Sequence, residues 1–300
     1  MTDFVPRKNY GARLEPLDGV LHGAGQCLQA FEMYTDLLRD QRTLPLVYMM
    51  YISARKAPDK MEKNVAAWRE ALDRFPDLPL MPQIGLSMTS DGSPELHYEH
   101  EVAAGLHDDG LRRFFDALGE MGRPFFLRIG YECNGPWNGY EPSAYRDAFA
   151  RVTALLRESG VPAATVWCVE PHEIEKVYDW RPDDDLTDWW SVDWFDPIHM
   201  QASIAFLAEA DRRNKPVMIG ESSPRRLGTT DAAARWEKWY RPYFETIRNQ
   251  AGIKAFCYIN WDWQGRMAQW ADWGDSRLES DPELVKAWRE EMKSPLYLHA

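Results

Sequence analysis

The sequence predicts an α/β fold, a single-domain (β/α)8 TIM barrel that spans residues 1–300. Eight apolar, β-forming segments alternate with helical segments, and no linker or low-complexity tract divides the chain. The hydrophobic content of 45% is sufficient for a large core. Strands that alternate with helices run parallel, and eight such units in 300 residues favour a closed barrel. An open, doubly wound sheet is the alternative, but the sequence lacks the GxGxxG and GxxxxGK[ST] phosphate loops of nucleotide-binding sheets.

The first half of the chain contains four strand–helix units. Pro82 weakens the third strand, and Gly110 is expected to interrupt the long helix that follows it. The fourth helix is expected to begin after Ser143 as N-cap and to end at Gly160 as C-cap. The expected strands are 19–24, 44–53, 78–88 and 124–132, and the first three helices are 27–40, 60–75 and 99–121.

The second half contains four more units. Its strands are read from short β-branched and aromatic runs, and its helices from apolar residues at helical spacing. The expected strands are 164–170, 187–195, 215–221 and 253–263, and the helices are 201–213, 231–249 and 281–292.

Charge and composition exclude several classes of partner. A net charge of −12 argues against nucleic acid or an anionic membrane. No apolar run is long enough for a membrane span, and residues 1–11 lack the apolar stretch of a secretory signal, so a cytoplasmic location is expected. The four cysteines are far apart without a CxxC pair, which favours free thiols. We expect a carbohydrate partner and no metal or other cofactor.

Polar and charged residues collect at the predicted carboxyl ends of the strands, where barrel enzymes carry their active sites. Side-chain alternation puts Arg128 and Glu132 on one face of the fourth strand, and Glu221 ends the seventh. If both faces point inward, two carboxylates meet across the barrel mouth, as glycoside hydrolysis requires. Arg128 is expected one layer below, where its charge keeps a carboxylate ionised.

Three segments resemble glycoside hydrolase family 26, the β-mannanases and their relatives, within clan A. They are RIGYECNGPWNGY (128–140) for the fourth strand, DDDLTDWWSVDWF (183–195) for the sixth, and KPVMIGES (215–222) for the seventh. The resemblance implies a retaining hydrolase that cleaves O-glycosidic bonds of an oligo- or polysaccharide by double displacement. It implies Glu132 as acid/base and Glu221 as nucleophile, with carboxyl groups about 5–5.5 Å apart.

The sequence departs from the family pattern in three places. Tyr131 stands where the family has a histidine before the acid/base, and Asn138-Gly139 replaces part of a Trp-rich continuation. On the sixth strand, where clan members often place a tyrosine beside the nucleophile, this chain offers Trp194 and Phe195. These departures leave the mannan substrate open.

Further residues at strand ends and in the following loops are candidates for binding sugar. Aromatic faces suit the apolar faces of sugar rings, and amides and carboxylates suit hydroxyl groups. For each residue, packing or turn formation is the alternative interpretation. The candidates are Arg128, Asn134, Trp137, Tyr140, His22, Glu170, Asp193, Trp194, Asn260, Trp261 and Trp263.

Other function classes stay open beside the hydrolase. A non-catalytic carbohydrate-binding barrel or a transglycosylase would share the same site. A metal-dependent barrel hydrolase would need several His and Asp ligands, and none of the seven histidines forms an HxH pair.

Overall fold

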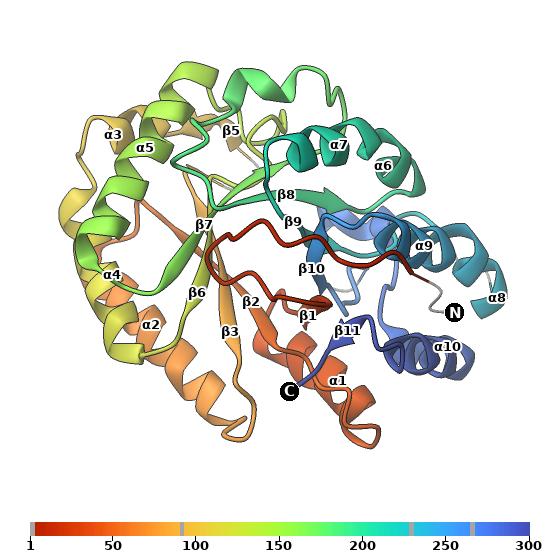
Figure 1. The fold of residues 1–300 in the computed structure, drawn as a ribbon. Coiled ribbons are helices and arrows are strands. Elements are labelled where there is room, and N and C mark those ends of the chain that lie inside the picture. Colours follow the sequence, from red (N-terminus) through yellow and green to blue (C-terminus); the bar gives the residue numbers. More distant parts are fainter. Residues whose placement is uncertain (1–3, 91–92, 228–230, 265–267) are drawn as a thin grey trace. The chain divides into compact units, whose positions relative to one another are not determined.

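A computed structural model describes residues 4–90, 93–227, 231–264 and 268–300, and Figure 1 shows its ribbon. The hydrogen-bonded order of the main sheet is β10-β9-β8-β7-β6-β3-β2-β1, and β11 pairs with β1. Because β10 also pairs with β1, in parallel, the eight strands form a closed cycle. The predicted (β/α)8 class is therefore confirmed.

The chain divides into two compact units, Met1–Gly11 with Glu15–Met49 and Val192–Ala300, and Ala12–Leu14 with Met50–Ser191. Two strands, β2 (Val47–Ser53) and β8 (Trp189–Trp194), contribute residues to both units. The single domain stays a prediction.

The unit Ala12–Leu14 with Met50–Ser191 contains the third, fourth and fifth barrel strands. Figure 1 shows α2, α4 and α5 along one side of these strands. Its elements are α2 (Pro58–Asp73), β3 (Met81–Ser87), β4 (Thr89–Ser90), β5 (Ser93–His97), α3 (Glu99–Ala103), α4 (Asp108–Met121), β6 (Phe125–Ile129), α5 (Pro142–Ser159), β7 (Ala163–Val169) and η1 (Val177–Trp180).

The other unit contains the first, seventh and eighth barrel strands. Its elements are β1 (Val20–Ala24), α1 (Leu28–Arg39), α6 (Pro197–Ala202), α7 (Ile204–Arg212), β9 (Val217–Ser222), α8 (Ala232–Arg235), the π-helical turn η2 (Trp236–Tyr240), α9 (Arg241–Asn249), β10 (Ile253–Tyr258), η3 (Ala268–Trp273), η4 (Leu278–Ser280), α10 (Pro282–Met292) and β11 (Tyr297–Leu298). Among the described residues, no helix combines the length and apolar character needed to cross a membrane.

Two expectations about helices are wrong. Gly110 lies inside α4, and the expected helix 99–121 breaks instead before it, where Gly105 adopts a φ of 81° that ends α3. Ser143 is not the N-cap of α5, because the side chain of Glu141 accepts from the backbone N–H groups of Ser143 and Ala144. Gly160 does end α5, with a φ of 69°.

Much of the aromatic content packs the core. Six tryptophans are fully buried, so the high tryptophan count is largely structural. In one unit Trp167 meets Trp190 edge-on at 4.8 Å between ring centroids. In the other, Tyr258 of β10 lies 4.7 Å from Trp288 of α10, again between centroids. The first contact joins two neighbouring strands, and the second holds α10 against β10.

Candidate active site

Glu132 lies in a turn beyond the fourth barrel strand and not on the strand itself. The strand β6 ends at Ile129, three residues before Glu132, so the alternation of side chains along the strand does not extend to Glu132. Gly130 and Glu132 then adopt positive φ angles of 55° and 50°. The expectation that Arg128 and Glu132 share a strand face is therefore wrong, because the pleat ends before the glutamate. A left-handed conformation at a non-glycine residue is uncommon and is typical of functional turns.

Hydrogen bonds within the turn hold Glu132 in this conformation. The Asn138 side-chain amide donates to the carbonyl oxygens of Tyr131 (3.1 Å) and Glu132 (2.9 Å). The backbone N–H of Gly135 donates to the same Glu132 carbonyl at 2.8 Å. The indole N–H of Trp137 donates to Oε2 of the Glu132 carboxyl group at 2.9 Å. Both ends of Glu132, backbone and side chain, are thus tied to residues 135–138.

Arg128 is fully buried in the body of β6. Its Nη2 donates to Sγ of Cys168 at 3.0 Å, and its guanidinium lies 5.1 Å from the centroid of the Tyr131 ring. The side chain thereby links β6 to β7 and supports the residue before Glu132. Its predicted effect on a carboxylate stays a prediction.

Asn134 connects the turn after β6 to the turn after β7. Its Nδ2 donates to the Glu170 carbonyl, and its Oδ1 accepts from the Glu170 N–H, each at 2.8 Å. The carboxyl group of Glu170 accepts from the backbone N–H of His172 at 2.9 Å and contacts its ring. Asn134, predicted as either a sugar ligand or a turn residue, therefore makes the backbone contacts of a turn residue.

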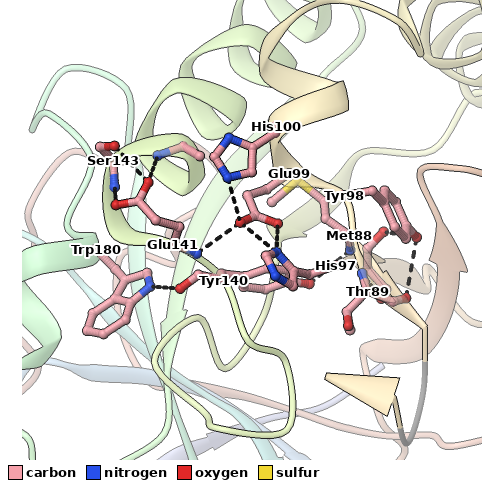
Figure 2. Close-up of polar contacts among 12 residues, drawn as sticks. Met88, Thr89, His97, Tyr98, Glu99, His100, Tyr140, Glu141, Ser143 and Trp180 are labelled. Carbon is pink, nitrogen blue, oxygen red and sulfur yellow. Dashed lines mark hydrogen bonds and ion pairs between the residues drawn. The ribbon is translucent and has the colours of Figure 1, made fainter. Parts of the chain in front are cut away.

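Tyr140 is held inside a polar network, which Figure 2 shows. Its ring is 4% exposed, its hydroxyl accepts from the Met88 N–H at 2.9 Å, and its carbonyl accepts from the Trp180 indole at 3.0 Å. Burial raises the pKa of its phenol far above the usual value. The predicted sugar platform therefore lies almost entirely beneath the surface.

The same network contains a buried carboxylate that the sequence reasoning missed. Glu99 is fully buried, accepts from Nδ1 of His97 at 2.8 Å, and accepts from the Glu141 N–H at 2.9 Å (Figure 2). His100 lies 3.8 Å away on the other side. The available signal was the run HYEHE at 97–101, where one carboxylate stands between histidines. This group fixes the segment that follows the turn carrying Glu132.

In the other unit, Glu221 belongs to β9 and is 8% exposed. Its backbone N–H donates to Oδ1 of Asp193 on β8 at 2.9 Å. Asp193, predicted as a sugar-binding residue, thus contacts the backbone of the predicted nucleophile. Trp194 is fully buried, and its indole donates to Ser203 at 2.9 Å while its ring meets Tyr243 edge-on, so it packs against helices.

The expected eighth strand is shorter than predicted, since β10 ends at Tyr258. Asn260 is buried, with its side chain bonded to Glu279 and to the Leu278 N–H. Trp263 is 4% exposed and packs on two further tryptophans, whereas Trp261 is partly exposed. Of these three candidates, Trp261 is the one with ring surface available to a ligand.

His22 lies within β1, inside the protein. One ring nitrogen bonds the Tyr34 hydroxyl at 3.1 Å, and the other bonds Nδ1 of His299 at 3.0 Å. Burial and the neighbouring His299 lower the pKa of His22 to about 3. These contacts are those of a satisfied core histidine.

Cys133 is buried, and burial raises the pKa of its thiol to about 12. Its thiol therefore stays protonated and is a poor nucleophile.

Two curated relatives are similar along almost the whole chain. A β-1,3-xylanase of Alcaligenes sp. is 27% identical over 96% of this chain, and the β-1,3-xylanase TXYA of Vibrio sp. is 28% identical over 95%. The chain spans about two thirds of their lengths, 66% and 67% respectively. No model of a protein family matches the chain.

Solved structures share the fold at low sequence identity. GH26C from Muricauda sp. MAR_2010_75 superposes with a TM-score of 0.67 at 11% identity, covering 94% of this chain and 87% of that one. A Cellulomonas fimi endo-β-1,4-mannanase double mutant gives 0.67 at 16% identity, covering 94% and 72%. These structures share the barrel fold of the chain, and together with the curated relatives they bear out its resemblance to glycoside hydrolases of the family 26 type.

Proposed function

We propose that the protein hydrolyses a β-linked polysaccharide with retention of anomeric configuration, and that β-1,3-xylan is the first substrate to test. The curated relatives, named as β-1,3-xylanases, support this substrate over mannan, since they match the chain more closely in sequence than the mannanases do. The departures from the mannanase pattern at residues 131, 138 and 194 also argue against mannan as the substrate.

The observation that carries the proposal is the placement of two glutamates. Glu132 follows β6, the fourth barrel strand, and Glu221 lies near the end of β9, the seventh. In a (β/α)8 barrel the carboxyl ends of all strands open on one face, where active sites lie. For a retaining enzyme the two carboxyl groups should lie about 5–5.5 Å apart.

The proposed reaction has two displacements. In the first, the Glu221 carboxylate forms a bond to the anomeric carbon while the bond to the leaving oxygen breaks, and Glu132 donates its proton to that oxygen. In the second, the Glu132 carboxylate takes a proton from water. The water oxygen then forms the new bond to the anomeric carbon, and the ester bond to Glu221 breaks.

Contacts within each unit suit these two roles. The turn contacts of residues 135–138 orient Glu132, which must change its protonation state twice in each cycle. The backbone bond from Glu221 to Asp193 fixes the strand from which the nucleophile projects. A nucleophile must stay ionised and in place, so a fixed backbone lowers the cost of reaching the transition state.

The decisive experiment measures product release from β-1,3-xylan, β-1,4-xylan and β-1,4-mannan by chromatography. Glu132→Gln and Glu221→Gln are compared with Glu175→Gln, which replaces an exposed glutamate outside the site. We expect cleavage of β-1,3-xylan, a loss of at least about 1,000-fold in both site variants, and no change in the control. Proton NMR of the first products should show the β-anomer of the substrate retained.

Several outcomes would contradict the proposal. Activity that survives Glu221→Gln would remove the assigned nucleophile, and an inverted first product would exclude double displacement. Activity lost on dialysis against a chelator and restored by a metal ion would favour the metal-dependent alternative. Binding without cleavage on every glycan would favour a binding barrel.

A further inference from the structure

We propose that Trp137 is a positioning residue for Glu132, and that it reserves Oε2 as a hydrogen-bond acceptor so that Oε1 carries the transferred proton. The inference rests on the proposed function, because it refines the role of Glu132 as acid/base. It adds an assignment of the two carboxyl oxygens, which the two-glutamate mechanism leaves open.

The first step of the argument is the chemistry of the donor. An indole N–H donates one hydrogen bond and accepts none. The oxygen that it contacts, Oε2, must therefore act as an acceptor whether Glu132 is ionised or protonated. When Glu132 is protonated, this contact favours the proton on Oε1, because the hydroxyl oxygen of a carboxyl group is a weaker acceptor than its carbonyl oxygen. One fixed contact thus separates the two oxygens by role.

The second step is that the chain is built to hold this indole in place. A Cβ atom at Gly135 would lie 2.6 Å from Cε2 and 2.9 Å from Nε1 of Trp137, so the ring lies directly over the glycine backbone. The Asn138 N–H also donates to the Gly135 carbonyl at 2.9 Å, which closes the turn beneath the ring. A side chain at position 135 would displace the indole from Glu132.

The third step concerns both halves of the reaction. The hydrogen bond is stronger to a carboxylate than to a neutral carboxyl group, so it favours the ionised form. That form acts as general base in the second displacement. Trp137 therefore assists the second displacement more than the first, while fixing which oxygen serves both.

Other ionisable groups surround the turn within the same unit. Arg128 lies under Tyr131, and Glu170 and His172 face the turn through Asn134. None of these is altered by replacing Trp137, so a change in the titration of Glu132 would report the lost indole contact.

The test replaces Trp137 by Phe, which keeps a ring over Gly135 but removes the N–H. The matched control is Trp180→Phe, which removes an indole N–H that donates to the carbonyl of Tyr140 instead of a carboxylate. The first measurement is the titration of Glu132 by ¹³C NMR of carboxyl-labelled protein, with Glu132→Gln identifying the signal. The second is the pH profile of kcat/KM on the substrate found above.

We expect Trp137→Phe to move the Glu132 titration, and with it the alkaline limb of the pH profile, upward by about half a unit to one unit. The sign follows because losing a donor to the ionised form favours the protonated form. The control should leave both unchanged. A rate that falls without any shift in titration would overturn the inference, since the ring would then serve packing alone.

The NMR titration also separates this inference from the proposed function. If no glycan is cleaved, or if Glu132→Gln stays active, the proposed function fails. The carboxyl titration still decides whether Trp137 holds Glu132: an upward shift in Trp137→Phe supports the positioning contact, and an unchanged titration overturns it.

Discussion

At the scale of single residues, position 135 requires glycine because the Trp137 ring occupies the space that a side chain would take. Replacing it with Ala places a methyl group 2.6 Å from the Trp137 ring, so the ring must move away from Glu132. We expect Gly135→Ala to lower kcat/KM about tenfold, because one oriented contact to the acid/base is lost. Its melting temperature should change little, since the displaced ring is 41% exposed.

Gly110→Ala is the matched control for this prediction. A Cβ there meets its neighbours at 3.6 Å or more, within a helix that glycine destabilises. This variant should be more stable by about 0.5–1 kcal/mol and fully active. Full activity in Gly135→Ala would show that the ring position does not matter.

The candidate site residues follow from the sequence by type and position but not by contact. The sequence singles out Glu132 and Glu221 because carboxylates stand at the predicted ends of the fourth and seventh strands. The conformation of Glu132 could not be foreseen, since a positive φ at glutamate has no marker in the sequence. The sequence presents Asn134 and Tyr140 as possible sugar ligands, because an amide or a phenol can bond a sugar hydroxyl and a backbone group equally well. Only the surrounding fold decides between the two uses.

At the scale of elements, Glu99 connects the hairpin β4–β5 and α3 to the segment after the acid/base turn. Glu99→Ala would leave the Glu141 N–H and His97 without their buried acceptor. We expect the free energy of unfolding to fall by about 2–4 kcal/mol in urea titrations, and kcat/KM to fall as Tyr140 loses its neighbour.

Glu101→Ala is the control on the same helix. Its side chain is 36% exposed and pairs with His107 at 2.9 Å, so its loss should cost less than about 1 kcal/mol. Equal stability of the Glu99 and Glu101 variants would show that the buried network contributes nothing specific.

Element types followed from the sequence more closely than element ends did. Short apolar, β-forming runs predict all eight barrel strands, because strands buried on both faces are nearly continuous in hydrophobic residues. The hairpin β4–β5 and the strand β11 are absent from the sequence prediction. The two-residue strands β4 and β11 carry no periodic signal, and β5, SPELH at 93–97, contains a proline and a glutamate in place of an apolar run. The fourth strand ended early because Gly130 at a φ of 55° turns the chain out of the sheet.

At the scale of the whole molecule, buried histidines make stability depend on pH. His22 titrates at about pH 3 in the folded protein, because burial disfavours its charged form, and near 6.5 when unfolded. Between these values the unfolded chain binds more protons, so the free energy of unfolding rises with pH. The contribution of His22 is complete above about pH 6.5 and is lost progressively as the pH falls toward 3.

The effect of His22 on the free energy of unfolding occurs at a higher pH than the effect of the carboxylates. Glu141 and Glu209 have pKa values lowered to about 2 by hydrogen bonds, so their contributions are lost only below about pH 4.5. In the window from pH 6.5 to 5, the wild type should lose up to about 1.4 kcal/mol per pH unit through His22 alone. His22→Gln should flatten the dependence in this window, whereas His100→Gln, with a side chain 63% exposed, should not. Urea titrations at half-unit steps measure the slope, and a wild-type slope retained in His22→Gln would place the proton uptake on another group.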